Sequence, residues 1–209
     1  SATFATILNV NNNTISPGQY TTLTAAINAA VAGDTILIAG SSTSYGPLNL
    51  TKRLTILGTG YFPRKDVQFI SKIDIINVTG GAADNSIIKG LDILTNNISS
   101  GLNFSGNTNG CEISRCFIHN VNGYPYTFQS ITNLTLYQNI FENSVNINNC
   151  NNVVVTNNIF NSTIFTSTGG TASSNVIVKN NLFLGSVAGN TYNLLFSNNI
   201  CYYRSTSLN

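Results

Sequence analysis

Charge is scarce in this chain of 209 residues. Only 8% of the residues are charged, against about 25% in an ordinary soluble domain, and the formal net charge is +2. The Lys and Arg residues are scattered, which excludes the basic surface that a nucleic-acid backbone requires. No apolar run approaches the roughly 18 residues that cross a bilayer, so we expect no membrane span.

Methionine and tryptophan are absent, and the chain begins at Ser1 without a recognisable signal peptide. We therefore interpret it as a mature, processed chain or an excised segment. Export is the expected processing event, which predicts an extracellular or cell-surface location.

Cysteine is also scarce. The closest pair is spaced C-x4-C and lacks a second set of metal ligands, so we expect neither a metal nor a cofactor. We interpret the cysteines as small buried apolar residues, with a sparse disulfide framework as the alternative. The four are Cys111, Cys116, Cys150 and Cys201.

Asparagine takes the place of the missing charge. The chain has 34 Asn, 24 Thr and 21 Ser, yet 42% of its residues are hydrophobic. This apolar content excludes a disordered chain and suits one domain with a sizeable core.

A block of nine residues recurs along the chain with one internal register. Successive copies from Asn85 onward start 18 to 25 residues apart, which is typical of a solenoid with loops of variable length. The blocks are short and rich in β-branched residues, which excludes a helical repeat. The clear copies are Asn133-LTLYQNIF, Asn152-VVVTNNIF, Asn175-VIVKNNLF and Asn193-LLFSNNIC, and the weaker ones are Arg53-LTILGTGY, Asn85-SIIKGLDI and Gly110-CEISRCFI.

Alternation inside the block places its first and third residues after the leading Asn on one face of a strand. Both positions are apolar, and we expect them to point inward. They are Leu134/Leu136, Val153/Val155, Val176/Val178 and Leu194/Phe196.

Two more inward columns follow. Six residues after the leading Asn, an asparagine ladder is predicted, in which each amide bonds to the copies above and below at a bend where Asn tolerates left-handed backbone. An aromatic stack is predicted two residues later, and the leading Asn residues form a second Asn column. The ladder is Asn139, Asn158, Asn181 and Asn199, with Leu91 and Cys116 replacing Asn in earlier coils, and the stack is Phe141, Phe160 and Phe183.

These coils resemble right-handed parallel β-helix proteins of the pectate-lyase-like superfamily, of the secreted bacterial type. Residues 20–38 (YTTLTAAINAAVAGDTILI) are similar to the opening of that superfamily, where a short amphipathic helix caps the solenoid. Residues 48–61 (LNLTKRLTILGTGY) resemble a following coil. The resemblance implies an all-β, right-handed parallel β-helix with a short N-terminal capping helix, an architecture that serves lyases, hydrolases, adhesins and phage spikes.

We divide this single domain, residues 1–209, into three parts. An N-terminal strand and capping helix are expected in 1–40, irregular first coils in 41–84, and regular Asn-ladder coils in 85–209. Nothing resembling a cap follows the last block, and terminal repeats of solenoids need a polar cap. We therefore expect self-association or a contact with neighbouring domains at the C-terminal end.

The resemblance also implies two kinds of enzymatic site. Lyases of this architecture hold calcium with clustered acids and use a basic residue to abstract a proton, and hydrolases use two or three Asp residues on adjacent coils. In this chain no two acids of the repeat share a column, but three acids in the irregular part could still converge: Asp66, Asp74 and Asp84.

His119 and Glu142 occupy the same block position on consecutive coils, which predicts a separation of about 5 Å. A His held by a carboxylate can act as a general base, so these are the catalytic residues if the chain is an enzyme. We favour the alternative that they form a surface ion pair.

The remaining signals concern binding. The outward residue two positions after the block start is polar in the earlier coils and apolar in the later ones. The later residues form an apolar strip, which predicts an association surface formed by Val154, Ile177 and Leu195. A polysaccharide is a second candidate partner, with outward polar residues and tyrosines as its contacts, among them Tyr137, Gln138, Asn157, Asn180, Tyr124, Tyr126, Tyr202 and Tyr203.

The sequence therefore favours a non-catalytic extracellular structural or adhesive β-helix protein, a subunit that stacks head-to-tail into a surface filament. The alternative is a carbohydrate-active enzyme, either a polysaccharide lyase or a glycoside hydrolase, or a glycan-binding module of the pectate-lyase-like class.

Overall fold

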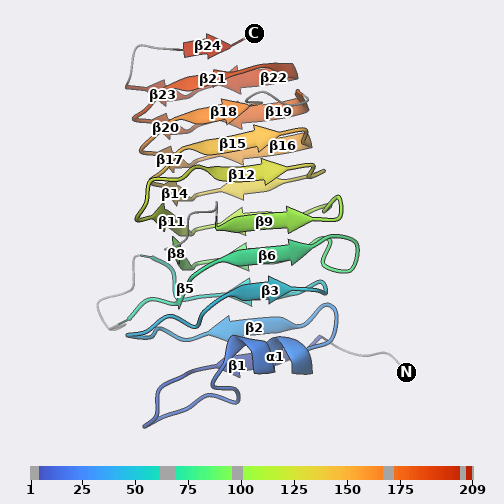
Figure 1. Cartoon of the computed structure of the whole chain (residues 1–209), viewed down its shortest axis with the longest axis vertical. Helices are drawn as coiled ribbons and strands as arrows, with labels where there is room; N and C mark the ends of the chain where they lie inside the picture. The colour runs from blue at the N-terminus through green and yellow to red at the C-terminus, as the bar shows by residue number, and fades with distance from the viewer. Residues whose placement is uncertain (1–4, 62–68, 96–100, 167–171, 203–205, 209) are drawn as a thin grey trace.

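A computed structural model describes residues 5–61, 69–95, 101–166, 172–202 and 206–208. In this part of the chain the strands pair in parallel, and one helix is present, α1 (Leu23–Ala29). The strands form a stack of coils, with β1 and α1 at one end and β24 at the other (Figure 1). The expected all-β parallel solenoid is confirmed. No helix of the described residues is long and apolar enough to cross a membrane.

The largest sheet, sheet A, has nine strands in the order of the coils. Each regular block contributes its first half to this sheet. The strands are β1 (Ile7–Val10), β2 (Thr35–Ile38), β4 (Thr55–Leu57), β7 (Ile87–Lys89), β10 (Glu112–Ser114), β13 (Thr135–Tyr137), β16 (Asn151–Thr156), β19 (Ser173–Lys179) and β22 (Thr191–Ser197).

Sheet C contains the second half of each block. Its seven strands are β5 (Lys72–Ile73), β8 (Asp92–Thr95), β11 (Phe117–Asn120), β14 (Ile140–Phe141), β17 (Ile159–Phe160), β20 (Leu182–Phe183) and β23 (Ile200–Cys201).

The third side of the stack is made of sheets B and D, where β9 lies next to β12 (Figure 1). Sheet B has β3 (Leu48–Leu50), β6 (Ile76–Thr79) and β9 (Leu102–Ser105). Sheet D has β12 (Tyr126–Gln129), β15 (Val145–Asn148), β18 (Ile164–Thr166), β21 (Val187–Gly189) and β24 (Thr206–Leu208).

Left-handed backbone recurs at two positions of the regular block. One is the leading Asn of the block, as in Asn152 (φ 56°), and the other is the residue before the ladder Asn, as in Asn157 (φ 58°). The expectation that the ladder residues themselves adopt this conformation is therefore wrong, because the preceding residue makes the bend. Ten of the thirteen described non-glycine residues with positive φ are Asn, whose short polar side chain tolerates this region.

The interior of the stack is apolar, as the alternation predicts. Side chains at the first and third block positions are buried in the coils of Asn133, Asn152 and Asn175, and half-buried in the last coil at Leu194 and Phe196. All four cysteines are free thiols, and Cys111, Cys116 and Cys150 are buried. Burial raises the pKa of the Cys111 thiol to about 11, so this group behaves as an apolar residue at neutral pH.

The N-terminal strand pairs with its own chain rather than with a neighbour. β1 lies beside β2 in parallel register. Its other edge bonds to Tyr20, whose N–H donates to the Asn9 carbonyl (3.0 Å) and whose carbonyl accepts from Asn11 N–H (2.9 Å). The first strand edge of the solenoid is therefore partly occupied.

Helix α1 begins at a polar cap, since the Thr22 hydroxyl accepts a hydrogen bond from Ala25 N–H (3.2 Å). Its predicted apolar face, which includes Leu23, Ala26 and Ile27, is buried, and the helix contacts β1 and β3.

Asp34 fastens the segment before β2. Its carboxylate accepts hydrogen bonds from the backbone N–H of Thr6 (2.7 Å) and Val31 (2.8 Å). The bond from Thr6 is the main cause of a pKa below the ordinary Asp value, followed by partial burial, which opposes it.

We predict that Asp34→Asn destabilises the protein at neutral pH and much less in acid. A depressed folded-state pKa contributes stability above the unfolded pKa of about 3.9 and loses it as the pH falls through the folded value. The measurement is the urea unfolding free energy of both proteins from pH 7 to pH 2. A difference that stays constant over this range would refute the assignment.

Candidate functional site

The asparagine ladder is present inside the stack and is confirmed. Each ladder residue offers its Oδ1 to the preceding rung, which donates both a backbone N–H and a side-chain Nδ2–H. Asn139 donates to Asn158 Oδ1 at 2.8 and 3.1 Å, and Asn158 donates to Asn181 Oδ1 at 2.9 and 3.1 Å. Asn181 donates to Asn199 Oδ1 in the same way, which ends this inner ladder. At its other end, Asn139 Oδ1 accepts a hydrogen bond from Cys116 N–H (3.0 Å).

Aromatic rings stack beside the inner ladder. The ring centroids of Phe141 and Phe160 are 5.1 Å apart, and those of Phe160 and Phe183 are 5.0 Å apart, with nearly parallel planes. These spacings match the rise of one coil, about 4.8 Å. Amides and rings therefore hold the same coils together from two neighbouring inward columns.

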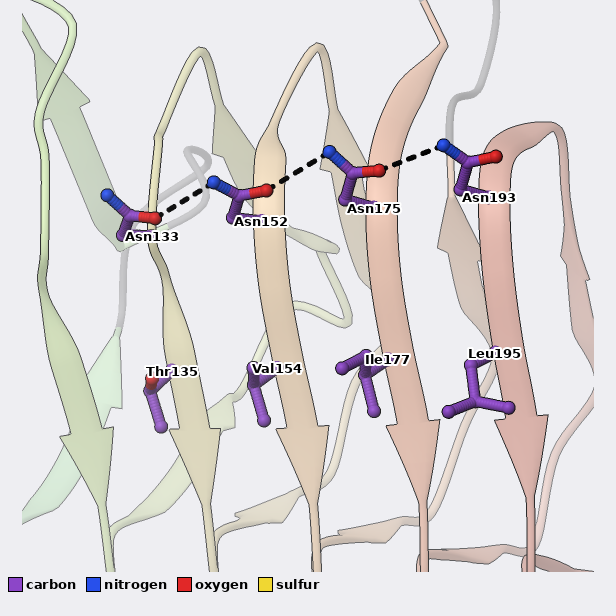
Figure 2. Close-up of a pocket in the computed structure, with 8 residues that line it drawn as sticks. All are labelled: Asn133, Thr135, Asn152, Val154, Asn175, Ile177, Asn193 and Leu195. Carbon is purple, nitrogen blue, oxygen red and sulfur yellow. Dashed lines mark hydrogen bonds between the residues drawn. The ribbon is translucent and has the colours of Figure 1, made fainter.

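A second amide ladder runs along the outside of sheet A. Each leading Asn donates its Nδ2–H to the Oδ1 of the Asn one coil before, as Asn152 does to Asn133 (3.1 Å) and Asn193 does to Asn175 (3.0 Å). Figure 2 shows this outer ladder as a continuous row of side chains from Asn133 to Asn193. It starts at Asn109, which replaces the leading residue Gly110 as a rung.

The predicted apolar strip lies next to the outer ladder. Val154, Ile177 and Leu195 follow Thr135 in one outward row, directly opposite one another in the strand register. The residues of the two rows, drawn in Figure 2, line a groove of about 540 Å³, called the sheet A groove below. Its lining residues are Asn133, Thr135, Asn152, Val154, Asn175, Ile177, Asn193 and Leu195, none of them charged.

A second outward apolar row, which was not predicted, lies on sheet C. The residue seven positions after the block start is apolar in five consecutive coils, and the strand register stacks these residues. The sequence itself carries this signal, at the position just before the Phe column. The row is Phe117, Ile140, Ile159, Leu182 and Ile200.

Both apolar rows become most exposed on the last coil. Leu195 is 52% exposed and Ile200 is 67% exposed, whereas Ile177 and Leu182 one coil before are only partly exposed. The strands that carry these rows, β22 and β23, are the last strands of sheets A and C. Tyr202 adds a further exposed apolar side chain to this coil, at 79%.

His119 lies between two carboxylates. Its Nε2 is 2.6 Å from Oδ1 of Asp92, and its Nδ1 is 3.9 Å from Oε2 of Glu142. The ring also stacks on Phe117 with centroids 4.3 Å apart. The expected contact with Glu142 is therefore present, and it is the longer of two.

Asp92 was not predicted as a partner of His119, because the two residues occupy different positions of the repeating block. It lies opposite Phe117 in the register, and its side chain extends diagonally to the imidazole. Asp92 is 8% exposed and Glu142 is 45% exposed, so the imidazole links a buried acid to a solvated one. Such a chain can orient a His and move a proton, but its two acids lie at different ring nitrogens and do not converge on one point.

The other acids that were expected to converge make separate contacts. Asp74 accepts a hydrogen bond from the Ser44 hydroxyl, Asp84 accepts from Gly81 and Asn109 N–H, and Asp66 lies outside the described residues. Across the described ranges, no three His, Cys, Asp or Glu side chains are placed to hold a metal ion.

Tyr126 was expected to stack on a sugar, and this is wrong. The side chain is fully buried, and its hydroxyl donates to Asn143 Oδ1 (2.9 Å). Burial raises its pKa above the ordinary Tyr value. Tyr124 and Tyr202 are exposed, and Tyr203 lies outside the described residues.

Two of the expected polar contacts lie at a second hollow. Gln138 and Asn157 line a depression of about 530 Å³ at the corner between sheets A and C, together with Tyr61 and Arg115. Arg115 Nε donates to Gln138 Oε1 at 3.0 Å, so this cation is engaged within the protein.

The surface thus offers outward rows of amides and aliphatic groups and one carboxylate-flanked His. No family model, no curated protein and no solved structure matches this chain. Its function is therefore inferred from these surfaces.

We predict that Asn158→Leu lowers the unfolding free energy by roughly 3 kcal/mol or more, since it strands several buried hydrogen-bonding groups on both neighbouring coils. Asn199→Leu is the matched control at the half-buried end of the ladder, where a loss of about 1 kcal/mol is expected. Urea denaturation measures both. Equal losses in the two variants would show that the inner rungs do not stabilise the coils.

Proposed function

We propose that this chain is a right-handed parallel β-helix of the pectate-lyase-like superfamily whose N-terminal end is capped by α1. Right-handed connection is supported by the strong preference of parallel crossovers for that hand. Capping is supported by the buried face of α1 and its contacts with β1 and β3. Membership of the superfamily is supported by the repeating block and by the helix-containing segment that precedes it.

We assign the chain the role of a non-catalytic structural or adhesive module outside the cell. The observation that carries this assignment is the pair of outward apolar rows, which run along a framework fixed by two amide ladders and are most exposed at Leu195 and Ile200. Large apolar side chains that follow one line on a surface mark an association site. A rigid rod with such lines suits a protein that holds other molecules.

Self-association through the last coil follows from the same observation. Among the described residues, β22 and β23 are the last strands of sheets A and C, and an edge strand can pair with an incoming strand or coil. The described residues of these two strands are uncharged, so like-charge repulsion does not oppose the approach of a second copy. Repeated head-to-tail contact of this kind gives a filament, because it is heterologous and need not close.

We predict that the wild-type chain forms oligomers or filaments in a concentration-dependent way and that Ile200→Asp shifts it toward monomer. The introduced carboxylate would have to be buried against the next copy. Leu184→Asp, at an exposed site one coil earlier, is the control and leaves association unchanged. Light scattering and negative-stain electron microscopy provide the measurement, and a wild type that stays monomeric at high concentration would contradict the proposal.

A carbohydrate-active enzyme is the second candidate. It is favoured by one specific arrangement, the Asp92, His119 and Glu142 chain, in which a buried acid holds an imidazole beside a solvated acid. In this reading His119 is the general base, Asp92 orients it and Glu142 is the exposed proton donor or acceptor.

The enzyme candidate predicts unsaturated or reducing ends from a polyuronate panel, with a loss of about a hundredfold or more in His119→Ala or Glu142→Ala. Lys179→Ala, an exposed residue on sheet A, is the control and keeps full activity. If the wild type releases no ends above the rate of the His119→Ala variant, this candidate is to be abandoned.

A further inference from the structure

The sheet A groove has two unlike walls that repeat together. One wall is the outer ladder, with an amide in each coil, and the other is the row Thr135, Val154, Ile177 and Leu195. Figure 2 shows the two rows running side by side across four strands. Both repeat once per coil, so polar and apolar groups recur along the rod axis every 4.8 Å or so.

The amides of the outer ladder retain hydrogen-bonding capacity. Asn152 uses one Nδ2–H to reach Asn133 and accepts one bond from Asn175. An Asn side chain has two N–H donors and an oxygen with two lone pairs. Within the part of the chain that the structure describes, one donor and one lone pair of Asn152 therefore face solvent. Asn133 offers the same pair, whereas Asn175 also donates to Asn151 Oδ1 (3.1 Å) and offers a lone pair only.

The size of the groove separates two kinds of occupant. About 540 Å³ falls within the range of roughly 300–1,000 Å³ that is typical of small-molecule sites. A stable protein interface takes about 20–30 residues from each partner, whereas eight residues line the groove. The groove is therefore suited to a narrow chain rather than to a second folded molecule.

The charge and the repeat distance of the groove indicate the chemistry of the ligand chain that would fit it. The eight lining residues are uncharged, so the groove offers no counter-charge to a polyanion such as a polyuronate. A linear chain of pyranose rings presents C–H faces and hydroxyl edges, and it advances by about one coil rise for each ring. Hydroxyl groups suit free amide donors and acceptors, and C–H faces suit the aliphatic row.

We infer that the sheet A groove is a binding site for a neutral linear polysaccharide, which lies along the rod axis with its hydroxyl groups on the outer ladder and its C–H faces on Val154, Ile177 and Leu195. This inference rests on the proposed adhesive function and names the molecule that is held. It assigns to the leading Asn residues a second role besides joining the coils.

The test uses the full chain, labelled with ¹⁵N, and NMR titration with cellohexaose, mannohexaose and xylohexaose, with hexagalacturonate as the charged comparison. At least one neutral hexasaccharide is expected to bind saturably, with a dissociation constant of about 1 mM or lower and little dependence on salt. The side-chain amide signals of the outer ladder should shift.

Variants locate the site. Ile177→Asp is expected to weaken binding at least about tenfold, because its charge lies in the groove and must lose water when the sugar binds. Asn152→Gly, which accepts the same positive φ, should also weaken binding. Leu184→Asp is the matched control, since it changes an exposed aliphatic residue of the same coil that lies outside both apolar rows, and it should leave binding within about twofold.

Three results would overturn the inference. These are no binding of any neutral hexasaccharide, equal or tighter binding of hexagalacturonate, or equal losses in Ile177→Asp and Leu184→Asp. A change in oligomer mass caused by Ile177→Asp would identify a second copy as the occupant and would also overturn it. Cleavage of a bound hexasaccharide would instead contradict the non-catalytic function and leave the groove assignment standing.

Discussion

The hydrogen bond from one ladder Asn to the Oδ1 of the next is the interaction on which the rest of the structure depends. Each inner rung ties a backbone N–H and a side-chain amide of one coil to the following coil, at a position sealed from water. A buried amide left without a partner is costly, so the ladder fixes both the corner and its register. The stacked rings of Phe141, Phe160 and Phe183 then meet at the coil spacing.

A corner that is fixed in register also determines which outward residues line up on the surface. Since the coils repeat in register, every outward position becomes a row along the rod, and the chemistry of that row is set by one position of the block. The rows of sheets A and C are aliphatic and flank polar corner residues such as Asn157. The same repetition that builds the core therefore produces long apolar rows on the surface, and their most exposed residues are Leu195 and Ile200.

The period and alternation of the block predicted the parallel solenoid, its inward columns and its inner ladder, because these depend on local pattern alone. The left-handed residue was misplaced by one position, since a sequence shows that a bend is needed but not which of two adjacent Asn residues makes it. Asp92 was missed because a side chain reaches diagonally between coils, which column counting ignores. The burial of Tyr126 depends on the path of the loop before β12, which the irregular sequence there does not specify.

The central claim is that the inner ladder amides are locked between coils, and hydrogen exchange of side-chain amides tests it most directly. The account predicts that the Nδ2 protons of Asn139, Asn158 and Asn181 exchange as slowly as the backbone N–H groups of the buried strands, while those of the exposed rungs Asn152 and Asn175 exchange quickly. Equal, fast exchange at both sets of amides would contradict it.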